Sequence, residues 1–175
     1  AAAYDMGNGQ AIISTTDFFT PIVDDAVSFG KIASANAISD VYAMGGKPLM
    51  AIAILGWPVN TLSAALAAEV LEGARSICAE AGIPLAGGHS IDSTDSVFVL
   101  SVNGIIPVVR IKKYNGGKPS DLLFLTKPLR SGILSTARKR GLLQSEHNEP
   151  LLKNMGTLNS FGEQVGTMSG VHALT

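Results

Sequence analysis

The stretch SFGKIASANAISDVYAMGGKPLMAIAILGW, residues 28–57, decides the fold of this 175-residue chain. Over residues 28–44 the apolar side chains recur at the spacing of one helix face, and a Gly-Gly pair then supplies a stop. Residues 48–55 are almost wholly apolar between a proline and a glycine, which indicates a strand buried on both faces. The stretch therefore predicts a helix that packs against a well-covered sheet.

Helices and strands continue on both sides of this stretch. A turn signal at residues 7–9 predicts a hairpin that enters a strand over residues 10–16. Apolar spacing predicts a second helix over residues 62–81, whose start Thr61 or Ser63 can cap. The remaining predicted elements are strands over residues 83–86, 96–107 and 122–126, a helix over residues 131–140, and a glycine-interrupted helical segment over residues 149–171.

The predicted elements indicate the fold class, and the composition excludes several classes of partner. Strands and helices that are apolar on more than one face favour an α+β or α/β sandwich. The 13 basic and 14 acidic side chains give a net charge of -1, which excludes a field that gathers nucleic acid or an anionic membrane. The single cysteine, Cys78, excludes an internal disulfide and lies where a thiol behaves as a small buried hydrophobe. The near-neutral charge therefore predicts a small-molecule partner. No apolar run approaches the roughly 20 residues that span a bilayer, and the start carries no basic region followed by an apolar stretch, so a cytoplasmic location is predicted.

Asn36 and Asp40 stand four residues apart on the first predicted helix and project from the same side. A carboxylate beside a carboxamide can hold a divalent cation. Asp17, at the end of a predicted strand, offers a second carboxylate, and two suffice for Mg²⁺ on a nucleotide because water and phosphate oxygens complete its octahedron. Two plainer readings stay open, namely a solvent-facing Asp40 and a hydrogen-bonded turn for Asp17.

A glycine pair, Gly87 and Gly88, follows another predicted strand and precedes His89 and Ser90. Paired glycines let backbone N–H groups approach an anion, and the Ser90 hydroxyl adds a donor. An ordinary turn, with His89 as a hydrogen-bonding loop residue, accounts for the same residues. The sequence has no Gly-Lys-Ser/Thr ending, which excludes an ordinary P-loop.

Three longer runs resemble selenophosphate synthetases. They are STTDFF at residues 14–19, NAISDVYAMGGKP at residues 36–48 and GGHSID at residues 87–92, in that family's order and at similar separation. The resemblance extends from about Tyr4 to Thr175. The third run argues against sister enzymes such as thiamine monophosphate kinase and the ribonucleotide synthetases.

The resemblance implies the α+β N-terminal domain of the aminoimidazole ribonucleotide synthetase-like superfamily, with a mixed sheet covered by helices. That domain dimerises through a β-barrel-like interface. The implied activity is selenide, water dikinase: ATP, selenide and water give selenophosphate, AMP and phosphate, and Mg²⁺ is required. Selenophosphate is the selenium donor for selenocysteine and selenouridine synthesis.

The family's site residues carry over onto matching positions only. Asp17 and Asp40 would contact nucleotide and metal, and Asn36 would support the phosphate site. Gly88, His89 and Ser90 would form a further nucleotide contact. A small local difference is Arg130, where the family usually has glycine.

The resemblance also implies parts outside these residues. The family's reactive Cys or selenocysteine, a nearby Lys and another metal-binding Asp would precede Ala1, and an Asp-containing continuation into a second domain would follow Thr175. We therefore expect residues 1–175 to form the ATP-binding domain, with residues from about 149 leading toward a C-terminal domain, and to make no selenophosphate alone. The alternative is a catalytically inert module for nucleotide binding and dimerisation.

A homodimer is the expected assembly. In the family the sheet is completed across a two-fold interface. The predicted strand over residues 96–107 would otherwise be an exposed edge.

Overall fold

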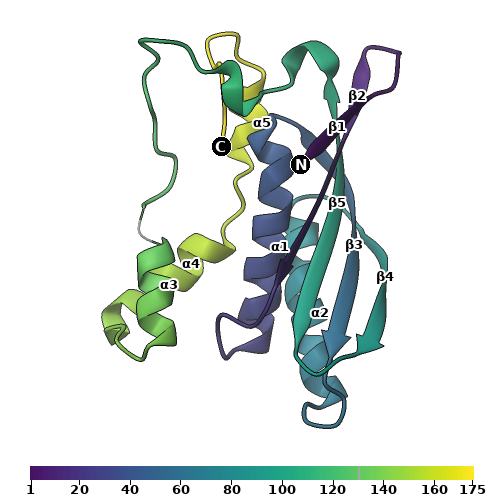
Figure 1. Cartoon of the computed structure of the whole chain (residues 1–175), viewed down its shortest axis with the longest axis vertical. Coiled ribbons are helices and arrows are strands. Elements are labelled where there is room, and N and C mark those ends of the chain that lie inside the picture. Colours follow the sequence, from purple (N-terminus) through teal and green to yellow (C-terminus); the bar gives the residue numbers. More distant parts are fainter. Residues whose placement is uncertain (130) are drawn as a thin grey trace.

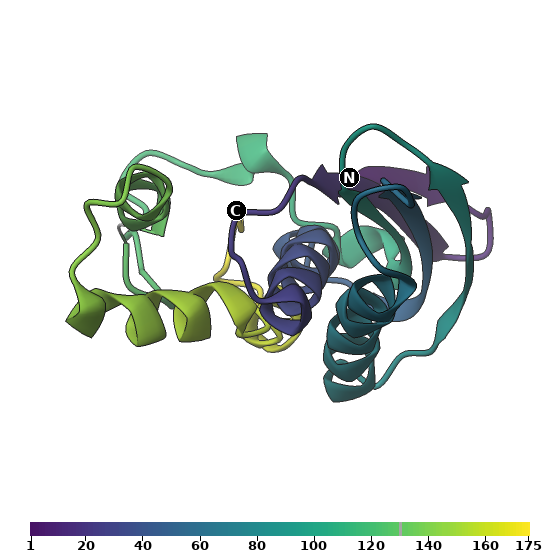
Figure 2. The ribbon, with the colours of Figure 1, turned by 90° about the horizontal axis from the view of Figure 1, so that it is seen from below.

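A computed structural model describes residues 1–129 and 131–175 of the chain, and Arg130 lies outside the described residues. Five strands form one mixed sheet, with helices on one of its faces (Figures 1 and 2). The strands are β1 (Ala2–Asp5), β2 (Gln10–Phe19), β3 (Lys47–Trp57), β4 (Leu85–Asp92) and β5 (Val97–Pro107). The α-helices are α1 (Ala26–Ala43), α2 (Ala64–Glu80), α3 (Ser131–Lys139), α4 (Asn148–Gly156) and α5 (Phe161–Gly166). Short 3₁₀ turns span Val108–Arg110, Tyr114–Gly116 and Ser145–His147.

The strand order is β1-β2-β5-β3-β4. Strands β3 and β4 run parallel because α2 connects them, and all other neighbours are antiparallel. The expectation that residues 96–107 form a sheet edge is wrong, since β5 lies between β2 and β3 and is paired on both sides. The edges are the short β1 and β4.

Capping residues set the helix boundaries. The Asp25 carboxylate accepts a hydrogen bond of 2.7 Å from Ser28 N at the start of α1. Ser63 Oγ accepts one of 3.3 Å from Leu66 N at the start of α2, which confirms the predicted serine cap. After these helices Gly45 and Gly82 adopt φ of 75° and 71°, which glycine tolerates without strain.

Two glycines let α1 and α2 pack in close contact. A Cβ atom on Gly30 would overlap the carbonyl oxygen of Val70, and one on Gly73 would overlap the carbonyl oxygen of Val27. The contact is therefore reciprocal, with each helix backbone resting on a glycine of the other. The pair covers the sheet as one layer, as Figure 2 shows.

The helices cover only one face of the sheet. Along β3 the side chains of Ala51, Ala53 and Leu55 are buried, whereas Ile52 and Ile54 are 38% and 42% exposed. The expected burial on both faces is thus wrong, because no element of the described residues packs on the second side. We call that side the open face; its exposed large apolar residues include Ile12, Phe18, Ile52, Ile54 and Ile91.

The chain beyond β5 packs more loosely. The strand expected over residues 122–126 does not form, and the four side chains Leu122–Leu125 are 71% to 97% exposed. A strand needs a neighbour for its N–H and C=O groups, and the described residues offer none here. The interrupted helical segment is confirmed, with α4 ending at Gly156 and α5 at Gly166. Within the described ranges, the helices are all too short or too polar to cross a membrane.

Candidate functional site

The predicted site residues on β2 and α1 meet in the structure. Asn36 Nδ2 donates a hydrogen bond to Asp17 Oδ2, and Thr15 Oγ1 donates one of 2.7 Å to Asp40 Oδ2. Thr15 and Asp17 are two residues apart on β2 and therefore face the same helix. The helical spacing correctly predicts that Asn36 and Asp40 lie on one side of α1. We call these four residues the polar cluster.

The two carboxylates of the polar cluster differ in their hydrogen-bond partners and in their exposure to solvent. Asp17 does not end its strand as expected, because β2 continues to Phe19. Its second oxygen accepts a hydrogen bond of 2.8 Å from Phe18 N, so both of its oxygens have partners. The Asp40 side chain is 39% exposed. Asp40 therefore retains access to solvent and to a ligand.

The polar cluster offers oxygen atoms, which are the ligands that hard cations such as Mg²⁺ prefer. It contains two carboxylates, a hydroxyl and an amide, which is a donor set that suits Mg²⁺. In the described part of the chain no group of three or more His, Cys, Asp or Glu side chains is placed to hold a metal. A cation here would complete its coordination with water or phosphate oxygens.

The second predicted group lies elsewhere. Gly88, His89 and Ser90 are part of β4 and not of a loop, and they pair with Ala53, Ile54 and Leu55 of β3. Gly88 is required there because a Cβ would overlap the carbonyl oxygen of Ala53. Gly88 thus reflects a close approach of two strands, whereas a Cβ on Gly87 would meet nothing within 4 Å, and neither glycine is in the turn that the sequence favoured.

The structure does not bring this group to the polar cluster. Asp17, Leu100, Ala53 and Gly88 are aligned across four strands, so three interstrand spacings of about 4.8 Å separate Asp17 from Gly88, or about 14 Å. His89 pairs with Ile54, whose side chain lies on the open face, opposite to the face that carries the polar cluster. A cavity of about 480 Å³ beside β4 and α2 is lined by Gly88, His89 and Ser90.

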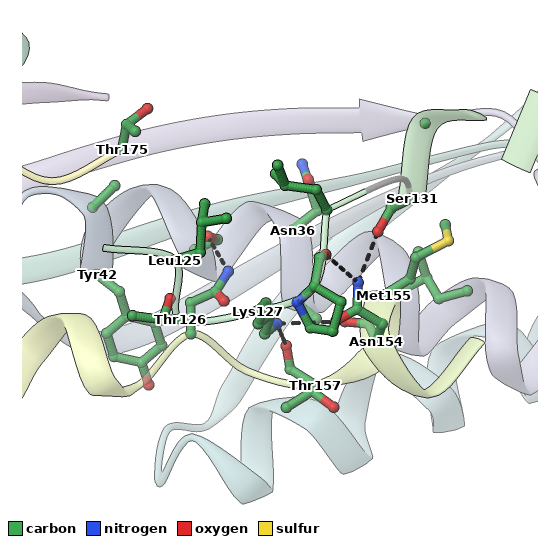
Figure 3. A pocket seen from close by; sticks show the side chains of 18 of the residues that line it. Asn36, Tyr42, Leu125, Thr126, Lys127, Ser131, Asn154, Met155, Thr157 and Thr175 are labelled. Atoms are coloured by element: carbon green, nitrogen blue, oxygen red, sulfur yellow. Dashed lines mark hydrogen bonds between the residues drawn. The ribbon is translucent and has the colours of Figure 1, made fainter. Parts of the chain in front are cut away.

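A larger cavity of about 590 Å³ lies between α1, the segment 124–129 and the helices α3 to α5 (Figure 3). Asn36 is part of its wall, so the cavity adjoins the polar cluster. Lys127 Nζ donates hydrogen bonds to the carbonyl oxygens of Thr157 and, at 3.4 Å, Asn154. Burial lowers the pKa of Lys127 because the charged form loses hydration.

The sequence alone indicates no role for Thr15 or Lys127. Thr15 is only 6% exposed, and its alternation with Asp17 was a usable signal once Asp17 had been chosen. Lys127 had no comparable signal, because its partners lie about 30 residues further along the chain. Cys78 is buried as predicted, and burial raises the pKa of its thiol to about 11.

Curated proteins are similar to this chain in sequence over its whole length. Selenide, water dikinase of Aeromonas salmonicida is 56% identical over all 175 residues, and that of Colwellia psychrerythraea is 58% identical. The chain spans about half (51%) of the length of each of these relatives. The resemblance to selenophosphate synthetases is thereby confirmed.

Solved structures confirm the fold at much lower identity. Thiamine monophosphate kinase from Aquifex aeolicus superposes with a TM-score of 0.80 at 18% identity, over 97% of this chain and 60% of that one. Hydrogenase maturation protein HypE in complex with ATP gives 0.73 at 18% identity, over 97% and 51% of the two chains. Residues 1–106, more than half of the chain, match the family described as "AIR synthase related protein, N-terminal domain". The chain therefore belongs to the family of AIR synthase related proteins, whose N-terminal domain it contains.

Proposed function

We propose that the protein acts in selenophosphate synthesis, in which ATP, selenide and water give selenophosphate, AMP and phosphate. One observation carries the proposal: Asp17 and Asp40, from a strand and a helix, converge with a hydrogen-bonding partner for each carboxylate. The 56% identity to a curated selenide, water dikinase over the whole chain supports the same reaction. The cytoplasmic location stays a prediction.

The polar cluster is the proposed binding site for Mg²⁺ and the nucleotide phosphates. Asp40 and Asp17 would hold the cation, while Thr15 and Asn36 orient the two carboxylates through the hydrogen bonds described above. When bound, Mg²⁺ would neutralise phosphate charge and align the transferred group. The exposed part of the Asp40 side chain provides the approach.

Substitution of Asp40 tests this assignment. Asp40→Asn keeps the shape but removes the charge that holds a hard cation, so calorimetry should detect weaker Mg²⁺-dependent ATP binding in a folded variant. Asp95→Asn is the matched control, because Asp95 is exposed in the turn before β5 and lies outside the polar cluster. If both variants bind Mg²⁺ and ATP as the unmodified chain does, the metal role of Asp40 is wrong.

Binding and turnover are separable in these 175 residues. Cys78 is the only cysteine, and its buried thiol with a pKa of about 11 is not a nucleophile at neutral pH. We infer that residues 1–175 alone bind nucleotide without making selenophosphate. Phosphorus NMR that shows selenophosphate formed by this chain would contradict the inference and would place the catalytic groups inside it.

The open face supports the proposed homodimer. It exposes isoleucine and phenylalanine side chains on β2, β3 and β4, and such a patch is costly to leave in water. Two copies packed through this face would form the barrel-like interface that the resemblance implies.

Light scattering tests the dimer. Ile54→Lys places a charge at the centre of the open face and should give a monomer at concentrations where the unmodified chain is a dimer. Val109→Lys is the control, because Val109 is 93% exposed and lies in the 3₁₀ turn Val108–Arg110 that follows β5, and so is not part of the sheet. A monomeric mass for the unmodified chain over a wide concentration range would remove the interface.

A further inference from the structure

The larger cavity has a chemistry different from that of the polar cluster beside it. Its lining, as far as the described residues define it, contains two lysines, Lys127 and Lys139, and no aspartate or glutamate. The lining also includes the aromatic side chains of Phe124 and Phe161, from the segment before α3 and from α5. A volume of about 590 Å³ lies within the usual range for small-molecule sites, which is roughly 300–1,000 Å³.

Lys127 is a fixed, half-buried cation. Two of its three N–H groups can be assigned to the carbonyl oxygens of Asn154 and Thr157, which hold the ammonium at the end of α4. Among the described residues no carboxylate lies within salt-bridge distance of Lys127 or of Lys139. A partly desolvated cation without a counter-charge is destabilising, and an anionic ligand would relieve that cost.

We propose that this cavity binds a flat organic molecule that carries one phosphate group. The phosphate would lie near Lys127 and Lys139, and the flat body would pack against Phe124 and Phe161. Such a ligand needs no metal, because a single phosphate is balanced by two ammonium groups. This site adjoins the polar cluster at Asn36 but differs from it in chemistry, because the polar cluster offers carboxylates and requires a cation before it can accept phosphate.

The probe is AMP, a nucleoside monophosphate that the proposed reaction releases. Only this choice of probe rests on the proposed function. Calorimetry would be carried out on the full 175-residue chain with EDTA present, so that no metal supports binding at the polar cluster. AMP should bind, whereas inorganic phosphate alone and adenosine alone should each bind at least tenfold more weakly, because each keeps only half of the contacts.

Two lining residues with exposed side chains allow the site to be altered without disturbing the core. Lys139→Gln and Phe124→Ala should each weaken AMP binding about tenfold, the value of a lost charged hydrogen bond or ring contact. Their neighbours Arg140 and Leu123 do not line the cavity. Arg140→Gln and Leu123→Ala should therefore leave the dissociation constant within about twofold, and thermal melting checks that all four variants are folded.

The outcomes distinguish this proposal from the assignment of the polar cluster. Asp40→Asn should lower Mg²⁺-ATP binding and leave metal-free AMP binding unchanged. AMP binding that survives in both Lys139→Gln and Phe124→Ala overturns the cavity site, as does an absence of AMP binding. If AMP binds as described while Asp40→Asn has no effect on Mg²⁺-ATP, the cavity site stands and the proposed metal site fails.

Discussion

The chain up to Pro107 and the chain after it are stabilised in different ways. All but two of the buried apolar residues in the described chain lie in residues 1–107, which we call the sheet region; the exceptions are Leu151 and Leu158. In residues 108–175, the C-terminal region, polar contacts hold the backbone. Lys112 Nζ donates to the carbonyl oxygens of Met168 and Val171 at 3.0 and 2.6 Å, and His172 lies 2.8 Å from Asp121.

The two regions contribute differently to the free energy of folding and to the candidate sites. Burial of apolar surface gives the sheet region most of its free energy of folding, because exposed polar contacts are each worth little. The polar cluster lies wholly within the sheet region, so its geometry is fixed by the core. The larger cavity lies at the boundary, where α1 meets the looser C-terminal region.

The largest contrast should come from one leucine in each region. Leu100 is buried at the centre of the sheet, and Leu100→Ala should cost about 3–4 kcal/mol of unfolding free energy through the cavity that it leaves. Leu123 is 97% exposed, so Leu123→Ala should change stability by less than about 0.5 kcal/mol. Urea unfolding measures both, and equal losses would mean that the two regions share one core.

A pair of glycines gives a contrast of intermediate size. Gly30→Ala forces a methyl group against the Val70 carbonyl and should cost about 2–3 kcal/mol by separating α1 from α2. A methyl group on Gly132, in α3, would meet nothing within 4 Å, so Gly132→Ala should stabilise by about 0.5–1 kcal/mol through helix propensity. A thermal midpoint that is unchanged or raised in Gly30→Ala would contradict the close helix contact.

Helix caps provide the smallest contrast. Asp25→Ala should cost about 1 kcal/mol at pH 7, whereas His147→Ala should be nearly neutral, because the residue before α4 makes no side-chain cap bond. The hydrogen bond from Ser28 lowers the pKa of Asp25 below the ordinary value of 3.8. The Asp25 contribution should therefore be present above pH 3.8 and disappear as pH falls through the lower, folded-state pKa.

Unfolding of the Asp25→Ala variant and the unmodified chain between pH 2 and 7 checks this sign. The stability difference between them should shrink only on the acid side of 3.8, the ordinary pKa of that carboxyl. A difference that persists unchanged at the lowest pH would show that Asp25 acts by packing and not by its charge.

Local patterns in the sequence were sufficient for the helices and insufficient for the sheet. The expected 28–44 helix forms as α1, within two residues at its start and one at its end, because apolar spacing and caps act over a few residues. The central position of β5 depends on its pairing with β2 and β3, and the open face depends on where the helices pack. Neither arrangement can be recognised from a short stretch of sequence. The segment 122–126 has strand composition but no partner among the described residues.

The site residues also fall into two groups, those that a local pattern in the sequence indicates and those that depend on contacts between distant segments. Asp17, Asn36 and Asp40 could be chosen from helical spacing and family resemblance, and the structure brings them together. The double glycine suggested a turn, yet Gly88 is needed because β4 approaches Ala53 closely inside the sheet. Thr15 and Lys127 depend on contacts between distant segments, which no short pattern encodes.

The central position of β5 also governs the order of events during synthesis. Strands β2 and β3 flank β5 and make no ladder with each other, so the first 96 residues can form a hairpin and helices but not the complete sheet. Asp17 is joined to Leu100 only after a further 83 residues have been made, which takes on the order of 4–17 s at translation rates of 5–20 residues per second. During that interval the apolar faces of β2 and β3 are unprotected, and a nascent chain paused before Val97 is the form most exposed to aggregation and most in need of a chaperone.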